Sequence, residues 1–290
     1  MTVIAATLFW ACGRSGSERY TPEFTREGAP AAVPLLFGVH PLHNPQHLFE
    51  VYGPVVDHLN RNLHQVRIQL EASRSYEEFE KKLYARHFHF ALPNPVQSLE
   101  SLGHGYRIFG KMGDDGEFRG ILIVRKDAGI ETVDDLRGKI VSFPAPTALA
   151  ATMMPLWFLH SKGLDVNRGI ERLFSGSQES SIMNVYLGRS AAAATWPVPW
   201  KTFAEGNPAI AKELVVRWET PSLVNNGLVV RDDVPRKVAD ELGALLFSLH
   251  KHEEGRMLLS AIPLSRFEPA TEATYQPVRD FLKTYREVIR

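Results

Sequence analysis

The chain has 290 residues, and its 33 Lys and Arg balance 33 Asp and Glu, so the net charge is zero with neutral histidines. Hydrophobic residues make up 44%, which is enough to build a core and excludes a disordered chain. Zero net charge gives no overall field that would attract nucleic acid or an acidic membrane. The single cysteine excludes an intramolecular disulfide and a multi-cysteine metal site.

Residues 1–12 have the pattern of an export signal. The apolar run from Val3 to Cys12 is shorter than the roughly 20 residues that span a bilayer, but it has the length of a signal-peptide apolar region. Ala11 before Cys12 resembles a bacterial lipoprotein cleavage site, at which Cys12 would be lipidated. The alternative is an unprocessed N-terminal segment, since no Lys or Arg precedes the run. Residues 13–34 are predicted to be a flexible tether.

The folded part is predicted to begin at Leu35 with alternating strands and helices. Ser75 to Glu78 form a capping box that opens one of the helices. The order strand, helix, strand, helix, strand implies parallel pairing with crossover helices. The predicted elements are Leu35–His40 (strand), about Gln46–Asn62 (helix), Val66–Leu70 (strand), Ser75–Ala85 (helix) and Phe88–Leu92 (strand).

The middle of the chain repeats this pattern, and Pro155 is expected to kink its helix or to mark the true start. Two such units predict two lobes, residues 35–125 with 226–290 and residues 126–225. The predicted elements are Phe118–Arg125 (strand), Thr132–Asp135 (helix start), Lys139–Phe143 (strand), Ala148–His160 (helix), Arg172–Phe174 (strand), Gln178–Leu187 (helix), Ala191–Thr195 (strand), Asn226–Arg231 (strand), Pro235–His250 (helix) and Thr274–Val288 (helix).

Several short motifs resemble, in order and spacing, the phosphonate-binding proteins of ABC importers. The likeness extends from about Leu35 to Leu259 and implies an α/β, two-lobed type 2 periplasmic binding protein fold with a ligand cleft between the lobes. Members of this family serve transport, and some report a ligand to membrane sensor kinases. The motifs are Leu36–Val39, Tyr52–Pro54, Ser75–Phe79, Gly120–Ile130, Val133–Lys139 and Gly227–Arg231.

At the expected cleft the chain departs from the family. Tyr76 matches a family ligand contact, whereas Pro93 replaces an aromatic residue. The Ser/Thr-rich turn of the family is matched by Ala148–Ala151, with Thr147 as the nearby hydroxyl. Helix N-termini favour anions through their free N–H groups. The turn is therefore expected to hold an anion through fewer contacts than the Ser/Thr-rich turn of the family makes. The alternative is an ordinary helix start.

The next turns depart as well. Gln178 stands where the family has a histidine, with Glu179 beside it, and no residue matches an acid that meets an amino group of the ligand in some members. Trp196 and Trp200 follow a strand end, where open α/β sheets bind ligands, and are interpreted either as a cleft wall or as loop packing. Ser177 is interpreted either as a ligand contact or as a helix cap. The candidate ligand-binding residues are Tyr76, Pro93, Asn94, Thr147, Ala148, Leu149, Ser177, Gln178, Glu179, Thr195, Trp196 and Trp200.

Eleven histidines raise the question of a metal site. His40, His43 and His47 follow the first strand, but prolines interrupt them and no Glu-x-x-His motif supports them. Solvated or hydrogen-bonded histidines are the simpler interpretation, and we expect neither metal nor cofactor. His40 is expected to face the cleft together with Tyr76 and Asn94, across from Thr147, Gln178 and Trp196.

These observations predict a non-enzymatic, extracytoplasmic solute-binding protein. It would lie in the periplasm or be lipid-anchored at the outer side of the inner membrane, and it would capture a small ligand for an ABC permease. An oxyanion or small organic acid is expected, and a typical aminophosphonate is not. The alternatives are a ligand-sensing partner of a membrane sensor kinase or cyclase, and an enzyme built on the same fold.

Overall fold

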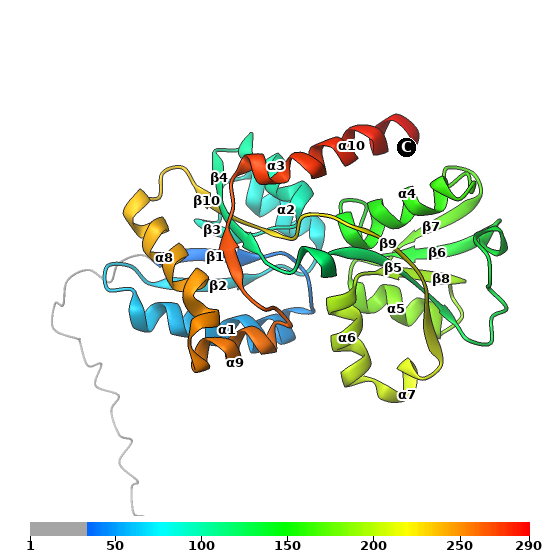
Figure 1. Cartoon of the computed structure of the whole chain (residues 1–290), viewed down its shortest axis with the longest axis horizontal. Coiled ribbons are helices and arrows are strands. Elements are labelled where there is room, and N and C mark those ends of the chain that lie inside the picture. Colours follow the sequence, from blue (N-terminus) through cyan, green and yellow to red (C-terminus); the bar gives the residue numbers. More distant parts are fainter. Residues whose placement is uncertain (1–33) are drawn as a thin grey trace, which may run out of the picture. The chain divides into compact units, whose positions relative to one another are not determined.

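Two β-sheets organise the chain in the computed structural model, which describes residues 34–290 (Figure 1). The predicted signal segment, the predicted lipidation site Cys12 and the tether as far as residue 33 lie outside the described residues. No helix among residues 34–290 has the length and apolarity that a bilayer crossing requires.

The first sheet has, within residues 34–290, six strands in the order β11–β4–β10–β3–β1–β2. β1 pairs in parallel with β2 and β3, whereas β10 runs antiparallel to β3 and β4. Together with its helices this sheet forms the first lobe. Its elements are β1 (Leu35–Val39), α1 (Pro45–Asn62), β2 (Ile68–Ala72), α2 (Tyr76–Tyr84), β3 (Phe90–Leu92), α3 (Pro95–Leu102), β4 (Tyr106–Met112), β10 (Gly227–Arg231), α8 (Arg236–Ser248), α9 (Glu253–Ala261) and β11 (Phe267–Pro269).

The second sheet, again within the described part of the chain, has five strands in the order β7–β6–β8–β5–β9. β6 pairs in parallel with β7 and β8, and β5 is antiparallel to β8 and β9. This sheet and its helices form the second lobe. Its elements are β5 (Arg119–Arg125), β6 (Lys139–Phe143), a π-helical turn (Leu149–Met153), α4 (Met154–Ser161), β7 (Ile170–Phe174), α5 (Gln178–Tyr186), β8 (Ala192–Thr195), α6 (Pro197–Gly206), α7 (Pro208–Ala211) and β9 (Leu214–Ser222).

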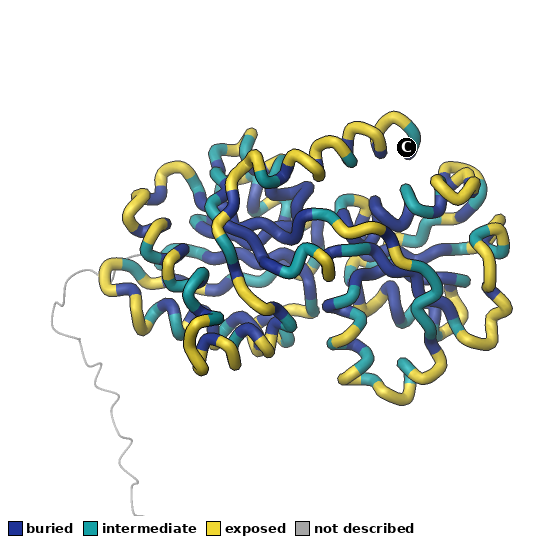
Figure 2. Tube along the Cα trace, in the orientation of Figure 1, coloured by how far each residue is buried: buried dark blue, intermediate teal, exposed yellow. Residues whose placement is uncertain are grey.

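Amphipathic helices cover the apolar strands in both lobes. Figure 2 shows strands of both sheets in dark blue and helices with yellow, solvent-facing turns. Helix α1 begins at Pro45, after the cap Asn44, whose Oδ1 accepts the N–H of His47 at 3.0 Å. One face of α1 is buried, and this face carries Leu48, Val51, Tyr52, Val55, Val56 and Leu59.

The chain crosses between the sheets twice. It leaves the first sheet after Met112 and enters the second at Arg119, because the whole of β5 pairs with β8 and β9. The crossing expected near Arg125 therefore lies one strand too late, and residues 119–125 belong to the second lobe. The return falls between β9 and β10. The strand that resembles the crossing strand of the family thus lies wholly in the second sheet, where it is antiparallel to both of its neighbours.

The last helix, α10 (Gln276–Val288), contacts both lobes. Its Arg286 pairs with Glu100 of α3 at 3.1 Å. In the second lobe, the Asn167 side chain donates to the carbonyl of Val288 at 2.9 Å, and Arg172 donates to the carbonyl of Arg290 at 2.7 Å. The C-terminal segment had been assigned to the first lobe alone, but it spans both.

A buried cation ties the two crossing segments together. Lys111, at the end of β4, is 4% exposed, and its Nζ lies 2.8 Å from Asp115 Oδ1 and 2.6 Å from Glu268 Oε1. The same Asp115 oxygen accepts the backbone N–H of Asn225 at 2.9 Å, and the Asn225 side chain donates to the Gly113 carbonyl at 2.7 Å. Asp115 belongs to one crossing and Asn225 to the other, so this network fixes their relative positions.

Replacing Lys111 with Met should therefore destabilise the fold. Two carboxylates lose their cation, but they are 45% and 28% exposed, so we expect a loss of about 2 kcal/mol rather than the larger cost of a fully buried pair. Urea unfolding measures this loss. The matched control is Lys237→Met, since Lys237 is 70% exposed and 3.9 Å from Glu241, and should change stability by less than about 0.5 kcal/mol. Equal, small losses in both variants would contradict the role of Lys111.

Candidate functional site

The carboxyl ends of parallel strands from both sheets meet at one place. His40 follows β1 and Asn94 follows β3, while the segment after β6 leads to Ala148 and Trp196 follows β8. Residues that follow parallel strands at their carboxyl ends share one edge of the sheet, where open α/β sheets bind ligands. Here two such edges line one cavity.

This inner cavity between the lobes is narrow, with a volume of about 10 Å³, close to the room that one water molecule needs. Among the described residues, no Lys, Arg, Asp or Glu lines it. The walls are therefore neutral and combine aromatic rings, amides and backbone. The lining residues are His40, Tyr76, Asn94, Phe118, Ala148, Leu149, Ala150, Ala151, Gln178, Trp196 and Asn226.

The turn after β6 offers backbone donors to the inner cavity. Its first helical hydrogen bonds run from the N–H groups of Thr152 and Met153 to the Ala148 carbonyl, at 2.8 and 3.2 Å. The N–H groups of Leu149, Ala150 and Ala151 precede these bonds and have no helical partner, as at any helix start. All three residues line the cavity. The turn thus lacks the side-chain hydroxyls of the family's Ser/Thr-rich turn, but it keeps three backbone N–H groups.

Pro155 lies in the first turn of α4 rather than at a kink in its middle. Proline has no N–H and its ring crowds the preceding turn, which explains why the chain widens into a π-helical turn over Leu149–Met153 before α4. The wide turn, together with α4, directs the positive end of the helix dipole at the cavity. The predicted alternative of a true helix start at Pro155 is therefore confirmed for α4.

A chain of hydrogen bonds through Gln178 joins the two lobes. The Gln178 side chain, 3% exposed, donates to the Tyr76 hydroxyl at 3.1 Å and accepts from the Thr195 hydroxyl at 2.7 Å. Burial raises the pKa of Tyr76 above its usual range, so the phenol stays protonated. Because its oxygen already accepts from Gln178, its O–H hydrogen is free to donate. Thr195 lies behind Gln178 and positions it.

A second link between the lobes occupies the hydroxyl of Thr147. Asn94 caps α3 and donates through its Nδ2 to the Thr147 carbonyl at 3.1 Å. The Thr147 hydroxyl donates to Glu80 Oε1 at 2.5 Å. Thr147 therefore joins the lobes instead of lining the inner cavity. Pro93 also lies outside it, since its carbonyl accepts the N–H of Gly227 at 3.1 Å within the first sheet.

His40 is a neutral imidazole in the wall of the cavity. Its Nδ1 lies 2.8 Å from the Leu92 carbonyl, which can only accept, so Nδ1 carries the hydrogen. Burial lowers the pKa of His40 to about 4, because the charged form is poorly solvated there. At neutral pH Nε2 is therefore a hydrogen-bond acceptor.

The two tryptophans separate. Trp196 is 2% exposed, lines the inner cavity and packs edge-on against Phe118, with ring centroids 5.5 Å apart. Trp200, one turn into α6, stacks on Phe203 at 6.1 Å and borders a separate groove. Of the two interpretations, a cleft wall holds for Trp196 but not for Trp200, because α6 begins at Pro197 and Trp200 borders the other groove. The cavity has a Trp196–Phe118 wall instead.

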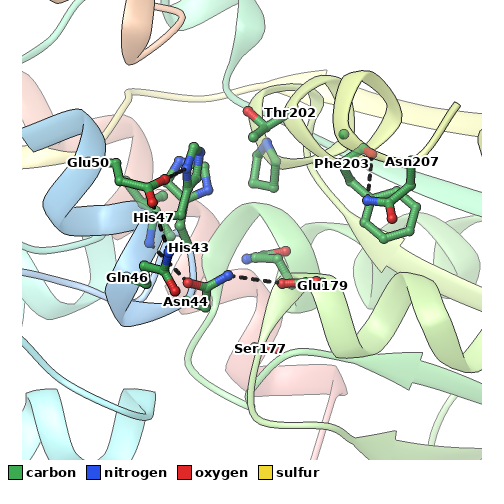
Figure 3. Close-up of a pocket in the computed structure, with 14 residues that line it drawn as sticks. His43, Asn44, Gln46, His47, Glu50, Ser177, Glu179, Thr202, Phe203 and Asn207 are labelled. Atoms are coloured by element: carbon green, nitrogen blue, oxygen red, sulfur yellow. Dashed lines mark hydrogen bonds and ion pairs between the residues drawn. The ribbon is translucent and has the colours of Figure 1, made fainter.

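A second, outer pocket of about 340 Å³ lies beside the inner cavity, and the two share Gln178. Ser177 and Glu179 line it rather than the inner cavity; Ser177 caps α5 by accepting the N–H of Ser180 at 3.1 Å. Figure 3 shows Glu179 facing Asn44 of the first lobe, with 3.4 Å between Oε2 and Nδ2.

His43 and His47 also line the outer pocket, with ring centroids 4.7 Å apart, and Glu50 lies 3.1 Å from His47 Nδ1 (Figure 3). Burial and the neighbouring histidines lower the pKa of His43 to about 3. Within residues 34–290 no group of three or more His, Cys, Asp or Glu is arranged to hold a metal ion.

Two lining residues lie outside both the predicted contacts and the predicted Ala148–Ala151 turn, namely Phe118 and Asn226. Phe118 directly precedes β5 and Asn226 directly precedes β10. Both therefore end a crossing segment, and crossing segments form the floor of a cleft between two lobes. A first crossing placed before Phe118 would identify this residue as part of the cleft, whereas the sequence predicts Asn226 as the first residue of a strand, which begins at Gly227 in the structure.

Comparison with solved structures places this fold among periplasmic binding proteins. The binding protein component of an ABC phosphonate transporter from Pseudomonas aeruginosa superposes with a TM-score of 0.80 at 16% identity, covering 88% of this chain and 87% of that one. The PhnD1 protein of Prochlorococcus marinus (MIT 9301), solved in complex with methylphosphonate, gives 0.78 at 19% identity, covering 88% and 98%.

Sequence comparison agrees with the structural one. The "Probable ABC transporter phosphite binding protein PhnD1" of Prochlorococcus marinus (strain MIT 9301) is 24% identical over 179 residues. That match spans 57% of this chain and 60% of the relative, less than two thirds of its length. Residues 37–275 match the family model described as "ABC transporter, phosphonate, periplasmic substrate-binding protein". Because this match includes strands and helices of both lobes, the chain belongs to the family of phosphonate periplasmic substrate-binding proteins of ABC transporters.

Proposed function

We propose that the protein captures a small oxyanion with a phosphonate-like head in the inner cavity and delivers it to an ABC permease. The observation that carries this proposal is the set of three N–H groups without a helical partner, on Leu149, Ala150 and Ala151, at a helix start that borders the inner cavity between the lobes. Such groups bind anionic oxygens through charge-assisted hydrogen bonds. The free hydroxyl hydrogen of Tyr76 adds a fourth donor from the opposite lobe.

The neutral walls argue against a ligand with an ammonium group. A buried ammonium needs a carboxylate or several acceptors to replace water. The nearest carboxylate beyond the wall, Glu80, already accepts from Thr147 and from Gln97. A short alkyl substituent, by contrast, fits against the Trp196 and Phe118 rings. The site thus favours phosphite, methylphosphonate or a similar small anion over 2-aminoethylphosphonate.

Lobe closure supplies the signal that a permease reads. The links through Gln178 and through Thr147 join residues of different lobes, so both form only when the cleft is closed. A ligand that contacts both walls would stabilise this state, as in other hinged binding proteins. We infer an extracytoplasmic, non-catalytic role, in which the closed form presents a surface assembled from both lobes.

Calorimetric titration of the full chain tests the ligand class. Methylphosphonate and phosphite should bind saturably, and a ligand at about 100 times its Kd should stabilise the protein by about 2.7 kcal/mol. 2-Aminoethylphosphonate should bind at least about tenfold more weakly than methylphosphonate, because its ammonium has no partner. Absence of binding by every phosphorus oxyanion would refute the proposal.

A substitution on the neighbouring strand β5 can displace the backbone N–H donors of Leu149, Ala150 and Ala151. Gly120 on β5 faces the turn, and a Cβ there would lie 2.5 Å from the Ala150 carbonyl and 2.7 Å from the Pro155 ring. Gly120→Ala should push the turn away and weaken methylphosphonate binding by about 10- to 100-fold, with a stability loss of about 1–3 kcal/mol. Gly116→Ala is the control, because a Cβ at Gly116 meets no atom within 4 Å. Unchanged affinity in a folded Gly120→Ala protein would contradict anion binding at this turn.

Removal of one amide distinguishes the two pockets. Gln178→Ala should weaken methylphosphonate binding by about 10- to 100-fold, since it frees the buried Tyr76 and Thr195 hydroxyls from their partner. Gln46→Ala removes a comparable amide from the outer pocket, where it donates to Glu50 at 3.0 Å, and should leave the Kd unchanged. A loss in Gln46→Ala without a loss in Gln178→Ala would move the binding site to the outer pocket.

A further inference from the structure

The inner cavity presents hydrogen-bond acceptors as well as donors. His40 donates its Nδ1 hydrogen to the Leu92 carbonyl, so the remaining ring nitrogen, Nε2, offers only a lone pair. Among the described residues no group donates to Nε2. The Leu92 carbonyl also accepts the backbone N–H of His40 at 3.2 Å, so two hydrogen bonds hold this part of the wall and fix the tautomer.

Asn226 supplies a second acceptor. It is 0% exposed, and its Oδ1 has no hydrogen-bond partner among residues 34–290. Its Nδ2 lies 3.5 Å from the Met112 sulfur. Because a thioether can only accept a hydrogen bond, this contact assigns the nitrogen end of the amide and leaves Oδ1 without a partner among the described residues, in a residue that lines the inner cavity. A buried carbonyl oxygen without a partner is costly, so a ligand donor would satisfy it.

An oxyanion without hydrogen would bind poorly beside these two groups. Its lone pairs would face the lone pairs of Nε2 and Oδ1, and no cation lines the cavity to compensate. The Glu80 carboxylate, behind Thr147 at 2.5 Å from its hydroxyl, adds a negative charge that disfavours a second charge on the ligand. An acid oxyanion that keeps one O–H satisfies both sides of the cavity.

We propose that the cavity selects an oxyanion that carries a proton, with Nε2 of His40 and Oδ1 of Asn226 as the two available acceptors for its single O–H, and rejects an anion of equal charge and shape that has none. The proton stays on the ligand, so no bond is made or broken. This inference rests on the proposed capture of a phosphonate-like anion. It defines the ligand as the monoanion of a phosphonate or phosphite and makes His40 and Asn226 specificity-determining residues.

Two nearly isosteric anions test the proposal in the wild-type full chain. A phosphoryl group loses its second proton near pH 6 or above, so at about pH 5.5 methylphosphonate is singly charged and carries one O–H. Methanesulfonate has the same charge and shape but no O–H. Calorimetry should show methylphosphonate binding at least about 100-fold tighter, as expected where a site's buried polar groups are left unpaired.

The relative affinities of methylphosphonate and methanesulfonate distinguish proton selection from simple oxyanion capture. Equal binding of both anions would overturn proton selection while leaving oxyanion capture in place. Binding of neither anion would refute oxyanion capture, and the present inference would fail with it. A preference for methanesulfonate would overturn the assignment of Nε2 and Oδ1 as acceptors.

The pH dependence gives an independent readout. The titratable groups packed around His40 are Tyr76, with ring centroids 6.0 Å apart, and His43. Burial raises the pKa of Tyr76 and lowers the pKa values of His40 and His43 to about 4 and about 3, so none of the three changes charge between pH 5.5 and 8.5. Above the second pKa of methylphosphonate its affinity should therefore fall about tenfold per pH unit, following the monoanion, whereas affinity for methanesulfonate should stay constant. A flat profile for methylphosphonate would contradict the proposal.

Two variants separate ligand recognition from folding. His40→Leu removes the acceptor, and the Leu92 carbonyl keeps its backbone donor; the affinity for methylphosphonate should fall by at least about 30-fold, while that for methanesulfonate does not fall. Asn226→Ala should shift the ratio in the same direction. The control His89→Leu removes an imidazole that accepts the Leu36 N–H at 3.0 Å outside the cavity and should leave the ratio unchanged. An unchanged ratio in both test variants would overturn the assignment.

Discussion

The inner cavity has no charged side chain among its described lining residues, and this is the physical constraint on the anion capture that we propose. An anion that leaves water for a cavity without a cation loses its hydration, and only oriented dipoles can replace it. The free N–H groups of Leu149–Ala151 supply those dipoles at the start of a helix. Backbone groups need no particular side chain, so a run of alanines can do what a Ser/Thr-rich turn does in the family. An alanine turn lacks hydroxyl contacts, so in our proposal His40, Asn226 and Tyr76 distinguish between ligands.

Lobe closure and ligand recognition use the same side chains. Gln178 links Tyr76 to Thr195 across the cleft, and Thr147 links Asn94 to Glu80. The crossing segments on the far side of these links are held by Lys111 and its two carboxylates. In the closure model that we propose, crossing segments held in place and polar contacts between the lobes favour two discrete states, open and closed, over a continuous range of angles between the lobes.

The sequence predicts strands and helices correctly where apolar periodicity or a helix cap marks them clearly. The heptad-like apolar face of α1, the serine caps of α2 and α5, and the strand after Lys139 all lie where the sequence placed them. Helix α3 and strand β4 are not among the elements that the sequence predicts. Helix α3 begins at Pro95, after the cap Asn94, and proline is well suited to a first helical turn. The strand β9, with polar residues on its exposed face, gave too weak an alternation to be recognised.

The sequence by itself determined the family and the two-lobed α/β architecture, because both rest on local motifs. It also predicted ligand contacts at a set of strand ends, from the rule that open α/β sheets bind ligands at the carboxyl ends of their parallel strands. Six of the twelve predicted contacts line the inner cavity, namely Tyr76, Asn94, Ala148, Leu149, Gln178 and Trp196. Only the tertiary structure decided which neighbouring groups are already engaged. The Thr147 hydroxyl donates to Glu80, and Trp200 stacks on Phe203 within α6. The tautomer of His40 is fixed by the Leu92 carbonyl, 52 residues away in the chain. Such pairings depend on distances between lobes and strands, which spacing along a chain does not encode.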